Sequence, residues 1–286
     1  MKTILVPTDF SPSANNAAKY ALKIAQKVKA NIKLCNAIKV PAESVLAAQV
    51  AWPLEDIEHL KDGSAVELIY LKEVLIQQTE ADNESSSFRP QIQHSTGVGN
   101  VTDYIRDIVY DDHINLVVMG MSGANMFSRF VLGSNSRDLI KKADFPLLLI
   151  PKNHIYSPIK KIGFATDLSE TDIDVLHSLA NFARYFNAEI LISHVLHTPG
   201  QEQKQVDAFL SDVTCKVDYP KIYYRSLQSD GVNEGLQWLT ENGQVDILVM
   251  VHRNHSLFDN SFTQKLAVKS KVPLMVLPDG FDKFLM

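Results

Sequence analysis

The chain has 286 residues, which is enough for one large domain or for two of ordinary size. A formal net charge of -5 and scattered basic residues argue against nucleic acid or an anionic membrane surface as a partner. No apolar run approaches the roughly 18 residues that cross a bilayer, and Pro7 and Asp9 come too early for a signal peptide, so we expect a cytoplasmic protein.

Taken in chain order, the first half alternates apolar strands with helices. A strand at 4–7 leads into a helix predicted over 13–29, which Ser11 or Ser13 can cap. Further strands are predicted at 32–38, 91–94, 116–119 and 146–150, with a long helix around 68–75 and a helix at 101–109 after a Gly-Val-Gly-Asn turn. Short, continuously apolar strands are typical of a parallel sheet covered by helices on both faces. The pattern predicts a five-stranded, doubly wound α/β unit.

The second half repeats this pattern. KTILVPTDFS aligns with KKIGFATDLS at an offset of 158 residues, NLVVMG aligns with DILVMV at 131, and DFPLLLIP aligns with KVPLMVLP at 127. The second copy therefore lacks 27 residues between its second and third strands, and four more in the segment before its last strand. A repeat of this length indicates a duplicated domain, because each copy can bury its own core.

The duplication predicts two α/β domains, over 1–152 and 158–280. The boundary falls in Lys152–Pro158, which is polar, contains proline and lacks periodicity. The inserted segment 41–90 of the first copy has no predicted role.

Glycines gather where a ligand would bind. In open α/β sheets, ligands lie outside the carboxyl ends of the strands, where the strand order reverses. Gly120 and Gly123 follow an apolar strand, and Gly133 with Ser134 precedes a predicted helix. A missing Cβ lets a ligand approach the backbone, and the N–H groups of a helix N-terminus favour an anion. The alternative interpretation is turn glycines with an ordinary N-cap serine.

The spacing of these glycines carries a resemblance. Neither GxxxxGK[ST] nor GxGxxG after the first strand is present. The pattern is Gly120-x2-Gly123-x9-Gly133-Ser134, the chain starts with Ile-Leu-Val-Pro-Thr-Asp-Phe-Ser, and its last strands end in proline. These features resemble the universal stress protein family, and the repeat is similar to a tandem member of it.

The resemblance implies a flavodoxin-like or adenine nucleotide alpha hydrolase-like fold, with the two domains paired through their last strands as an internal pseudo-dimer. It also implies that ATP, with Mg2+ as an accompanying ion, binds where the glycine motif is intact. Asp9 and the Ala37–Ile38 backbone would contact adenine, and Gly120 would lie near the ribose. Relatives often have His-Val where this copy has Asn36-Ala37, which departs from the pattern. The site residues carried over are Pro7, Thr8, Asp9, Ala37, Ile38, Met119, Gly120, Gly123, Gly133, Ser134, Asn135 and Ser136.

The second copy departs from the motif. Gly120 aligns with Val251, Gly123 with Asn254 and Gly133 with Asn260. Asp167 matches Asp9, but an aspartate after a strand is as often a helix cap. We expect this half to bind no nucleotide and to act as the structural partner of the first. His252 and His255, with Asp259 nearby, lack a third clear ligand, so no metal site is predicted.

Three functions follow as hypotheses. The first is a stress-response regulatory protein that binds ATP, or another adenine nucleotide, in its first half. The second is an enzyme; Arg129 and Arg137 are the arginines in and next to the glycine motif and no general base is evident, so at most weak ATP hydrolysis is expected. The third is an interaction module without nucleotide. A protein partner and a homodimer of tandem chains are further hypotheses.

Overall fold

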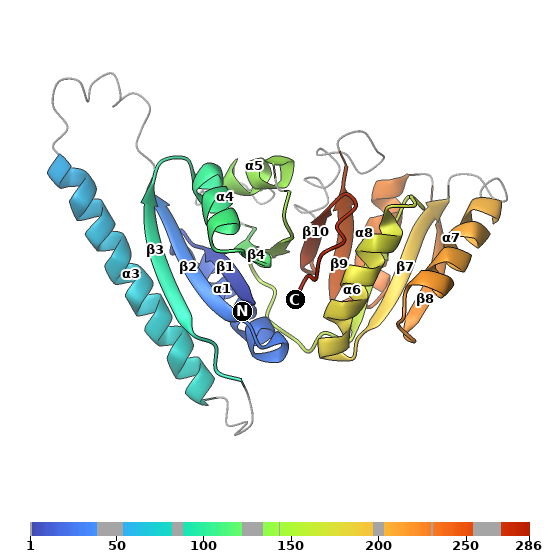
Figure 1. Cartoon of the computed structure of the whole chain (residues 1–286), viewed down its shortest axis with the longest axis horizontal. Coiled ribbons are helices and arrows are strands. Elements are labelled where there is room, and N and C mark those ends of the chain that lie inside the picture. Colours follow the sequence, from blue (N-terminus) through green and yellow to red (C-terminus); the bar gives the residue numbers. More distant parts are fainter. Residues whose placement is uncertain are drawn as a thin grey trace, which may run out of the picture. The chain divides into compact units, whose positions relative to one another are not determined.

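The computed structural model describes residues 2–38, 54–81, 88–121, 134–142, 144–196, 203–229, 231–253 and 270–286. Contacts divide the chain into two compact units, Met1–Gly120 and Met121–Met286. Each unit is an α/β arrangement in which strands and helices alternate along the chain (Figure 1).

The first unit contains a parallel sheet with the strand order β3-β2-β1-β4. Strand order reverses at β1, because the chain leaves β1 toward β2 on one side and returns to β4 on the other. Helices α1 and α3 contact each other, and α3 runs along β2 and β3 (Figure 1). The elements are β1 (Thr3–Pro7), α1 (Pro12–Val28), β2 (Asn31–Ile38), α3 (Leu54–Ala81), β3 (Ile92–Val98), α4 (Val101–Asp111) and β4 (Leu116–Gly120).

Helix α1 shows how the sequence builds this unit. The Ser11 hydroxyl accepts a hydrogen bond from the Ala14 N–H at 3.2 Å, which caps the helix, and Pro12 occupies its first position. Small and branched residues at helical spacing face the sheet and are fully buried, among them Ala17, Ala21 and Ile24. Lys29 ends the helix in the left-handed conformation.

The second unit has the strand order β5-β10-β9-β6-β7-β8. Its strands are parallel except that β5 runs antiparallel to β10. Helices α6 and α7 contact each other, and α8 packs on β7. The elements are α5 (Ser134–Lys142), β5 (Leu147–Ile150), β6 (Lys161–Ala165), α6 (Asp172–Phe186), β7 (Glu189–Leu196), α7 (Gln203–Lys216), β8 (Ile222–Gln228), α8 (Val232–Asn242), β9 (Ile247–His252) and β10 (Leu274–Pro278).

Strand β5 joins the two copies. By sequence it is the last strand of the first copy, yet it pairs with β10, the last strand of the second, with Leu148 opposite Met275. Both side chains are fully buried. The pairing through last strands that the resemblance implied is therefore present. The domain boundary at 152–158 stays a prediction.

One element differs from the sequence-based prediction. Strand β3 extends from Ile92 to Val98 and stays paired with β2 up to Ile38, whereas a strand at 91–94 was expected. Gly97 therefore lies in the strand rather than in a turn. Its missing Cβ makes room for the ring of Tyr104, which a side chain at this position would overlap. The turn is made by Gly99, whose φ is 125°. Of the inserted segment 41–90, residues 41–53 and 82–87 lie outside the described part of the chain.

Candidate functional site

The carboxyl end of β1 forms a tight turn into α1. The Thr8 hydroxyl accepts a hydrogen bond from the Phe10 N–H at 2.9 Å, and the Asp9 carboxylate accepts one from the Ser11 N–H at 3.1 Å. Phe10 adopts the left-handed conformation, with a φ of 61°. The two side chain to backbone hydrogen bonds hold the turn in this conformation. Thr8 is buried while Asp9 is exposed. The carboxylate of Asp9 is thus available to a ligand at the edge of the sheet.

Asn36 joins the ends of β1 and β2. Its amide nitrogen donates a hydrogen bond to the Thr8 carbonyl at 2.7 Å, and its amide oxygen accepts one from the Ser64 hydroxyl of α3 at 2.9 Å. In the second unit, His194 is 2.9 Å from the Thr166 carbonyl through Nδ1. This is the same contact, because His194 and Thr166 are the repeat counterparts of Asn36 and Thr8. Asn36, which stands where relatives often have histidine, therefore keeps the contact between the two strand ends next to Ala37 and Ile38.

Gly120 has a packing role at the end of its strand. It is the last residue of β4, and a Cβ there would lie 2.6–2.8 Å from the hydroxyl, carbonyl oxygen and carbonyl carbon of Ser13. The missing side chain therefore lets the first turn of α1 approach the strand, and the predicted place of Gly120 near a ribose stays a prediction. Ser13 is buried beside it, and its hydroxyl has no hydrogen-bond partner among the described residues.

The structure brings seven of the expected site residues to one edge. They stand at the carboxyl ends of the adjacent parallel strands β2, β1 and β4. Ser134 begins α5 in the other unit, where Asn135 is half-buried and Ser136 is buried. Gly123 and Gly133 lie outside the described residues, so the phosphate contacts stay a prediction. The seven residues are Pro7, Thr8, Asp9, Ala37, Ile38, Met119 and Gly120.

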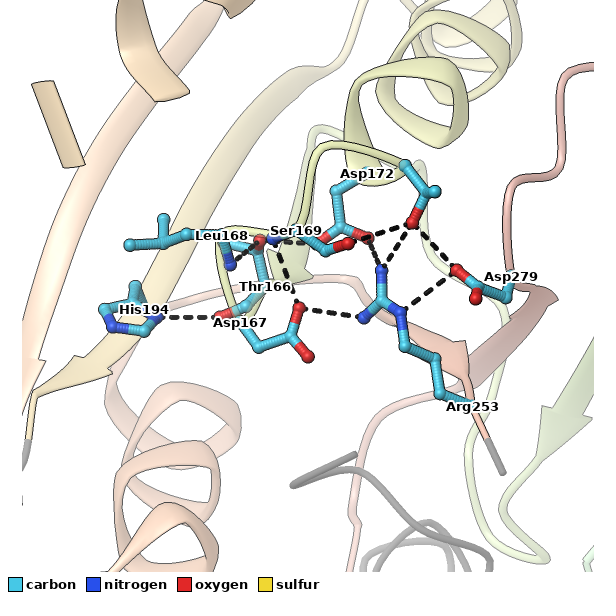
Figure 2. Close-up of polar contacts among 9 residues, drawn as sticks. Thr166, Asp167, Leu168, Ser169, Asp172, His194, Arg253 and Asp279 are labelled. Carbon is cyan, nitrogen blue, oxygen red and sulfur yellow. Dashed lines mark hydrogen bonds and ion pairs between the residues drawn. The ribbon is translucent and has the colours of Figure 1, made fainter. Parts of the chain in front are cut away.

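At the matching edge of the second unit, the Arg253 guanidinium binds three carboxylates (Figure 2). Arg253 follows β9 and donates to Asp167 at 2.9 Å, to Asp279 after β10 at 3.0 Å, and to Asp172 in the first turn of α6. Only 10% of the Arg253 side chain is exposed. Arg253 therefore lies against Asp167, the counterpart of the exposed Asp9.

Asp172 is the most buried member of this cluster. Its side chain is fully inaccessible, and it accepts a hydrogen bond from the Thr166 hydroxyl at 2.5 Å (Figure 2). Burial raises the pKa of Asp172 to about 6, although Arg253 and the Thr166 hydrogen bond oppose the shift. Burial would lower the pKa of Arg253, but the three carboxylates raise it. The guanidinium is thus held charged, and among the described residues of this cluster three carboxylates face one cation.

The sequence comparison identifies the protein class. The model of the universal stress protein family matches residues 1–151. The chain belongs to the universal stress protein family. It is 24% identical to the universal stress protein Slr1230 of Synechocystis sp. over 300 residues, which cover 96% of this chain and 99% of that one. A relative from Methanocaldococcus jannaschii, universal stress protein MJ0531, is 26% identical over 151 residues, covering 53% of this chain and 82% of that protein.

A solved structure supports the fold of this universal stress protein over its whole length. The crystal structure of a universal stress protein from Archaeoglobus fulgidus matches it with a TM-score of 0.72 and 17% sequence identity. The match covers 96% of this chain and 98% of the other. The likeness establishes a shared fold and leaves the ligand to be argued from the residues.

The Arg253 cluster was not predicted from the sequence of this universal stress protein. A helix cap was one of the alternatives for Asp167; it accepts the Ser169 N–H at 3.3 Å, and Thr171 is the N-cap of α6. The available signal was the repeat itself, because Arg253 aligns with a small residue, Ser122, directly after the matching strand. The exchange of Ser122 for Arg253 places a positive charge at the carboxyl edge of the second sheet.

The remaining polar candidates do not form a metal centre in the part of the universal stress protein that the structure describes. No three His, Cys, Asp or Glu side chains there are grouped closely enough to hold a metal ion. His252 is buried at the end of β9, and burial lowers its pKa. His255 and Asp259 lie outside the described residues. No described helix is long and apolar enough to span a membrane.

Proposed function

We propose that the first half of this universal stress protein binds one adenine nucleotide, ATP, at the carboxyl edge of β2, β1 and β4. The second half binds none and serves as its structural partner. The observation that carries this proposal is the contrast between two equivalent aspartates. Asp9 is exposed and accepts a hydrogen bond from its own turn, whereas Asp167 is bound to Arg253. A regulatory role in the stress response, in the cytoplasm, agrees with family membership.

The residues at the first edge fit the adenosine part of the nucleotide. Asp9 would accept a hydrogen bond from adenine, and the backbone at the end of β2 would contact the base beside Ala37 and Ile38. The Asn36 bridge to the Thr8 carbonyl fixes the distance between these two strand ends. The glycine motif and the hydroxyl groups at the start of α5 would hold the phosphates, since N–H groups at a helix N-terminus favour anions. Mg2+ would accompany the phosphates.

The second edge is unfavourable for a nucleotide for two reasons. The Arg253 side chain already forms hydrogen bonds with Asp167 and Asp172, so a base would have to displace it. The three carboxylates also outnumber the one guanidinium, so the edge repels phosphate. The second half therefore complements the fold through β10 rather than through a second ligand.

Equilibrium binding of ATP with Mg2+ tests this proposal. We expect one ATP per chain, and at least tenfold weaker binding for Asp9→Ala and for Gly123→Val. Asn254→Val is the matched control, because Asn254 occupies the position of Gly123 in the second half; it should bind ATP as the wild type does. No binding, two equivalents of ATP per chain, or an unchanged affinity in Gly123→Val would overturn the proposal.

An interaction module without nucleotide is the second candidate function. It is favoured by Gly120, whose missing Cβ already has a folding role in the contact with Ser13. A ligand selective for the native state stabilises it by about 2.7 kcal/mol at 100 times its dissociation constant. Saturating ATP should therefore raise the melting temperature, and an unchanged melting temperature would favour the interaction module. Hydrolysis, if measured, should be slow, because no general base is evident at the edge.

A further inference from the structure

A groove separates β8 from α8 in the second unit. It encloses a cavity of about 320 Å3, which is near the lower end of the volumes of small-ligand sites, roughly 300–1,000 Å3. Strand β8 is the last strand on its side of the sheet, and β7 separates it from β6, so the groove is distinct from the edge that Arg253 closes. The lining residues are Arg225, Ser226, Leu227, Gln228, Ser229, Glu234, Gly235 and Trp238.

A cation stacked on an aromatic ring forms one wall of the groove. The Arg225 guanidinium carbon lies 4.6 Å from the centre of the Trp238 ring. Within the described part of the chain, no carboxylate is within ion-pair distance of Arg225. Arg184 offers a contrast, because it lies 5.4 Å from the Tyr219 ring and also pairs with Asp218. Arg225 is therefore oriented by the indole, with its hydrogen-bond donors available to an anion.

Glu234 is the acidic residue that lines the groove, and its carboxylate is directed toward the start of α8. Its carboxylate lies over Gly231 at the start of α8, where a side chain at Gly231 would overlap it. Carboxylates are favourable at that end of a helix, because its first N–H groups lack partners. Glu234 thus belongs to the helix start and does not neutralise Arg225.

In the first half, an aromatic ring fills the corresponding space between strand and helix. There the Tyr104 ring of α4 covers Gly97 of β3, and its hydroxyl donates to the Ser95 hydroxyl at 3.1 Å. By strand register, Leu227 and Arg225 take the places of Gly97 and Ser95. By the helix alignment, Gly235 takes the place of Tyr104 and Trp238 that of Asp107.

These exchanges change both the shape and the charge of the groove. A Cβ at Gly235 would lie 2.7 Å from Val195 Cγ2, so β7 packs where the ring would start. Leu227 is buried and forms an apolar floor. The second half thus lacks the tyrosyl ring and gains an arginine and an indole at the groove. The first half folds with serine at this position, so the fold does not require an arginine there.

We propose that the β8–α8 groove binds a small organic carboxylate with an apolar, ring-bearing body. The carboxylate pairs with the Arg225 guanidinium, and the ring lies over Leu227 and beside the Trp238 indole. Charge-assisted, bidentate pairing with arginine provides orientation as well as affinity. Ser226 and Ser229 also line the groove. This site is independent of the proposed nucleotide site in the first half.

The probe for the test is 3-phenylpropionate, with its neutral amide as the control ligand. The full chain is titrated by ligand-observed saturation-transfer NMR, with ATP present and absent. We expect saturable binding of the acid, at least tenfold weaker binding of the amide, and no competition by ATP. Arg225→Gln should weaken the acid at least tenfold, whereas Arg184→Gln, at the other arginine–ring contact of this half, should leave it unchanged.

A second variant tests the shape of the groove. Val195→Ala combined with Gly235→Tyr restores the first-half pair Ala37 and Tyr104, so the ring should fill the groove and abolish binding. Val195→Ala alone should retain it. Equal affinity for acid and amide, equal effects of the two arginine variants, displacement by ATP, or undiminished binding in a folded double variant would each overturn the proposal. A thermal melt establishes that each variant is folded.

Discussion

At the residue scale, the buried carboxylate of Asp172 depends on Arg253, and loss of the guanidinium should lower the stability of the fold. Its side chain is fully buried, and its hydrogen bonds come from Arg253 and from the Thr166 hydroxyl. Removing one member of a buried pair leaves a desolvated charge, which usually costs about 3–5 kcal/mol. The cluster therefore ties α6 to the ends of β9 and β10.

Arg253→Met should destabilise the protein in a pH-dependent way. The pKa of Asp172 is raised to about 6, so the folded state binds this proton more tightly than the unfolded chain does. The contribution of Asp172 alone favours folding at low pH and is lost as the pH rises through 6. Above pH 6 the ionised carboxylate depends on Arg253, so we expect a loss of about 3 kcal/mol at pH 8 and a clearly smaller one at pH 5.

Thermal unfolding of the wild type and Arg253→Met at both pH values measures this difference. Arg184→Gln is the control, because it removes an exposed ion pair with Asp218 and should change stability little at either pH. An equal loss at pH 5 and pH 8 would show that the carboxylate of Asp172 does not depend on the guanidinium.

Gly120→Ala should destabilise the first unit. Its Cβ would lie 2.6–2.8 Å from Ser13, including the backbone, so helix α1 must move away from β4. Overpacking of this kind costs about 1–3 kcal/mol, which chemical denaturation can detect. Gly63→Ala is the matched control: its Cβ would meet nothing within 4 Å in helix α3, and alanine should add up to about 1 kcal/mol. A fully stable Gly120→Ala would instead favour a ligand as the reason for this glycine.

At the scale of the element, the two copies begin their first helices differently. Helix α1 begins at Pro12, whereas α6 begins at Asp172, two residues later in the repeat alignment. The later start accompanies Val251 in place of Gly120 in the matching strand, β9.

Most elements were predictable because their signals are local. Strands β1, β4 and β5 are continuous apolar runs buried on both faces, and α1 has apolar residues at helical spacing. Helix α3 was harder to delimit, because Val66 and Tyr70 on its exposed side are as apolar as the buried Leu68 and Leu71.

The parts of the site that the sequence could not predict depend on distant contacts. Arg253 meets Asp167 and Asp172 across more than 80 residues, and neither carboxylate has a local pattern that requires a cation. The fit of Gly120 to Ser13 spans more than 100 residues in the same way. In contrast, Asp9 was predictable, since an aspartate directly after the first strand of an open sheet stands at the binding edge.

At the scale of the molecule, strands from both copies of the repeat pair within the second unit. Leu147–Ile150 of β5 and Leu274–Leu277 of β10 are buried almost completely, and they pair antiparallel. One covalent chain thereby contains a contact that requires two copies of the fold. The second copy takes part in this pairing without the glycine motif.

Cutting the linker should leave this pairing intact. A protease site inserted between Lys152 and Pro158 divides the chain after β5, so the first fragment carries β5 and the second carries β10. The two fragments should elute together in native size-exclusion chromatography, because separation would expose the apolar side chains of both strands. Leu148→Asp buries a charge opposite Met275 and should release the fragments after cleavage. Lys152→Asp, which also introduces an aspartate but at an exposed position, should not. Fragments that separate without any substitution would show that the covalent linker, rather than β5 and β10, holds the copies together.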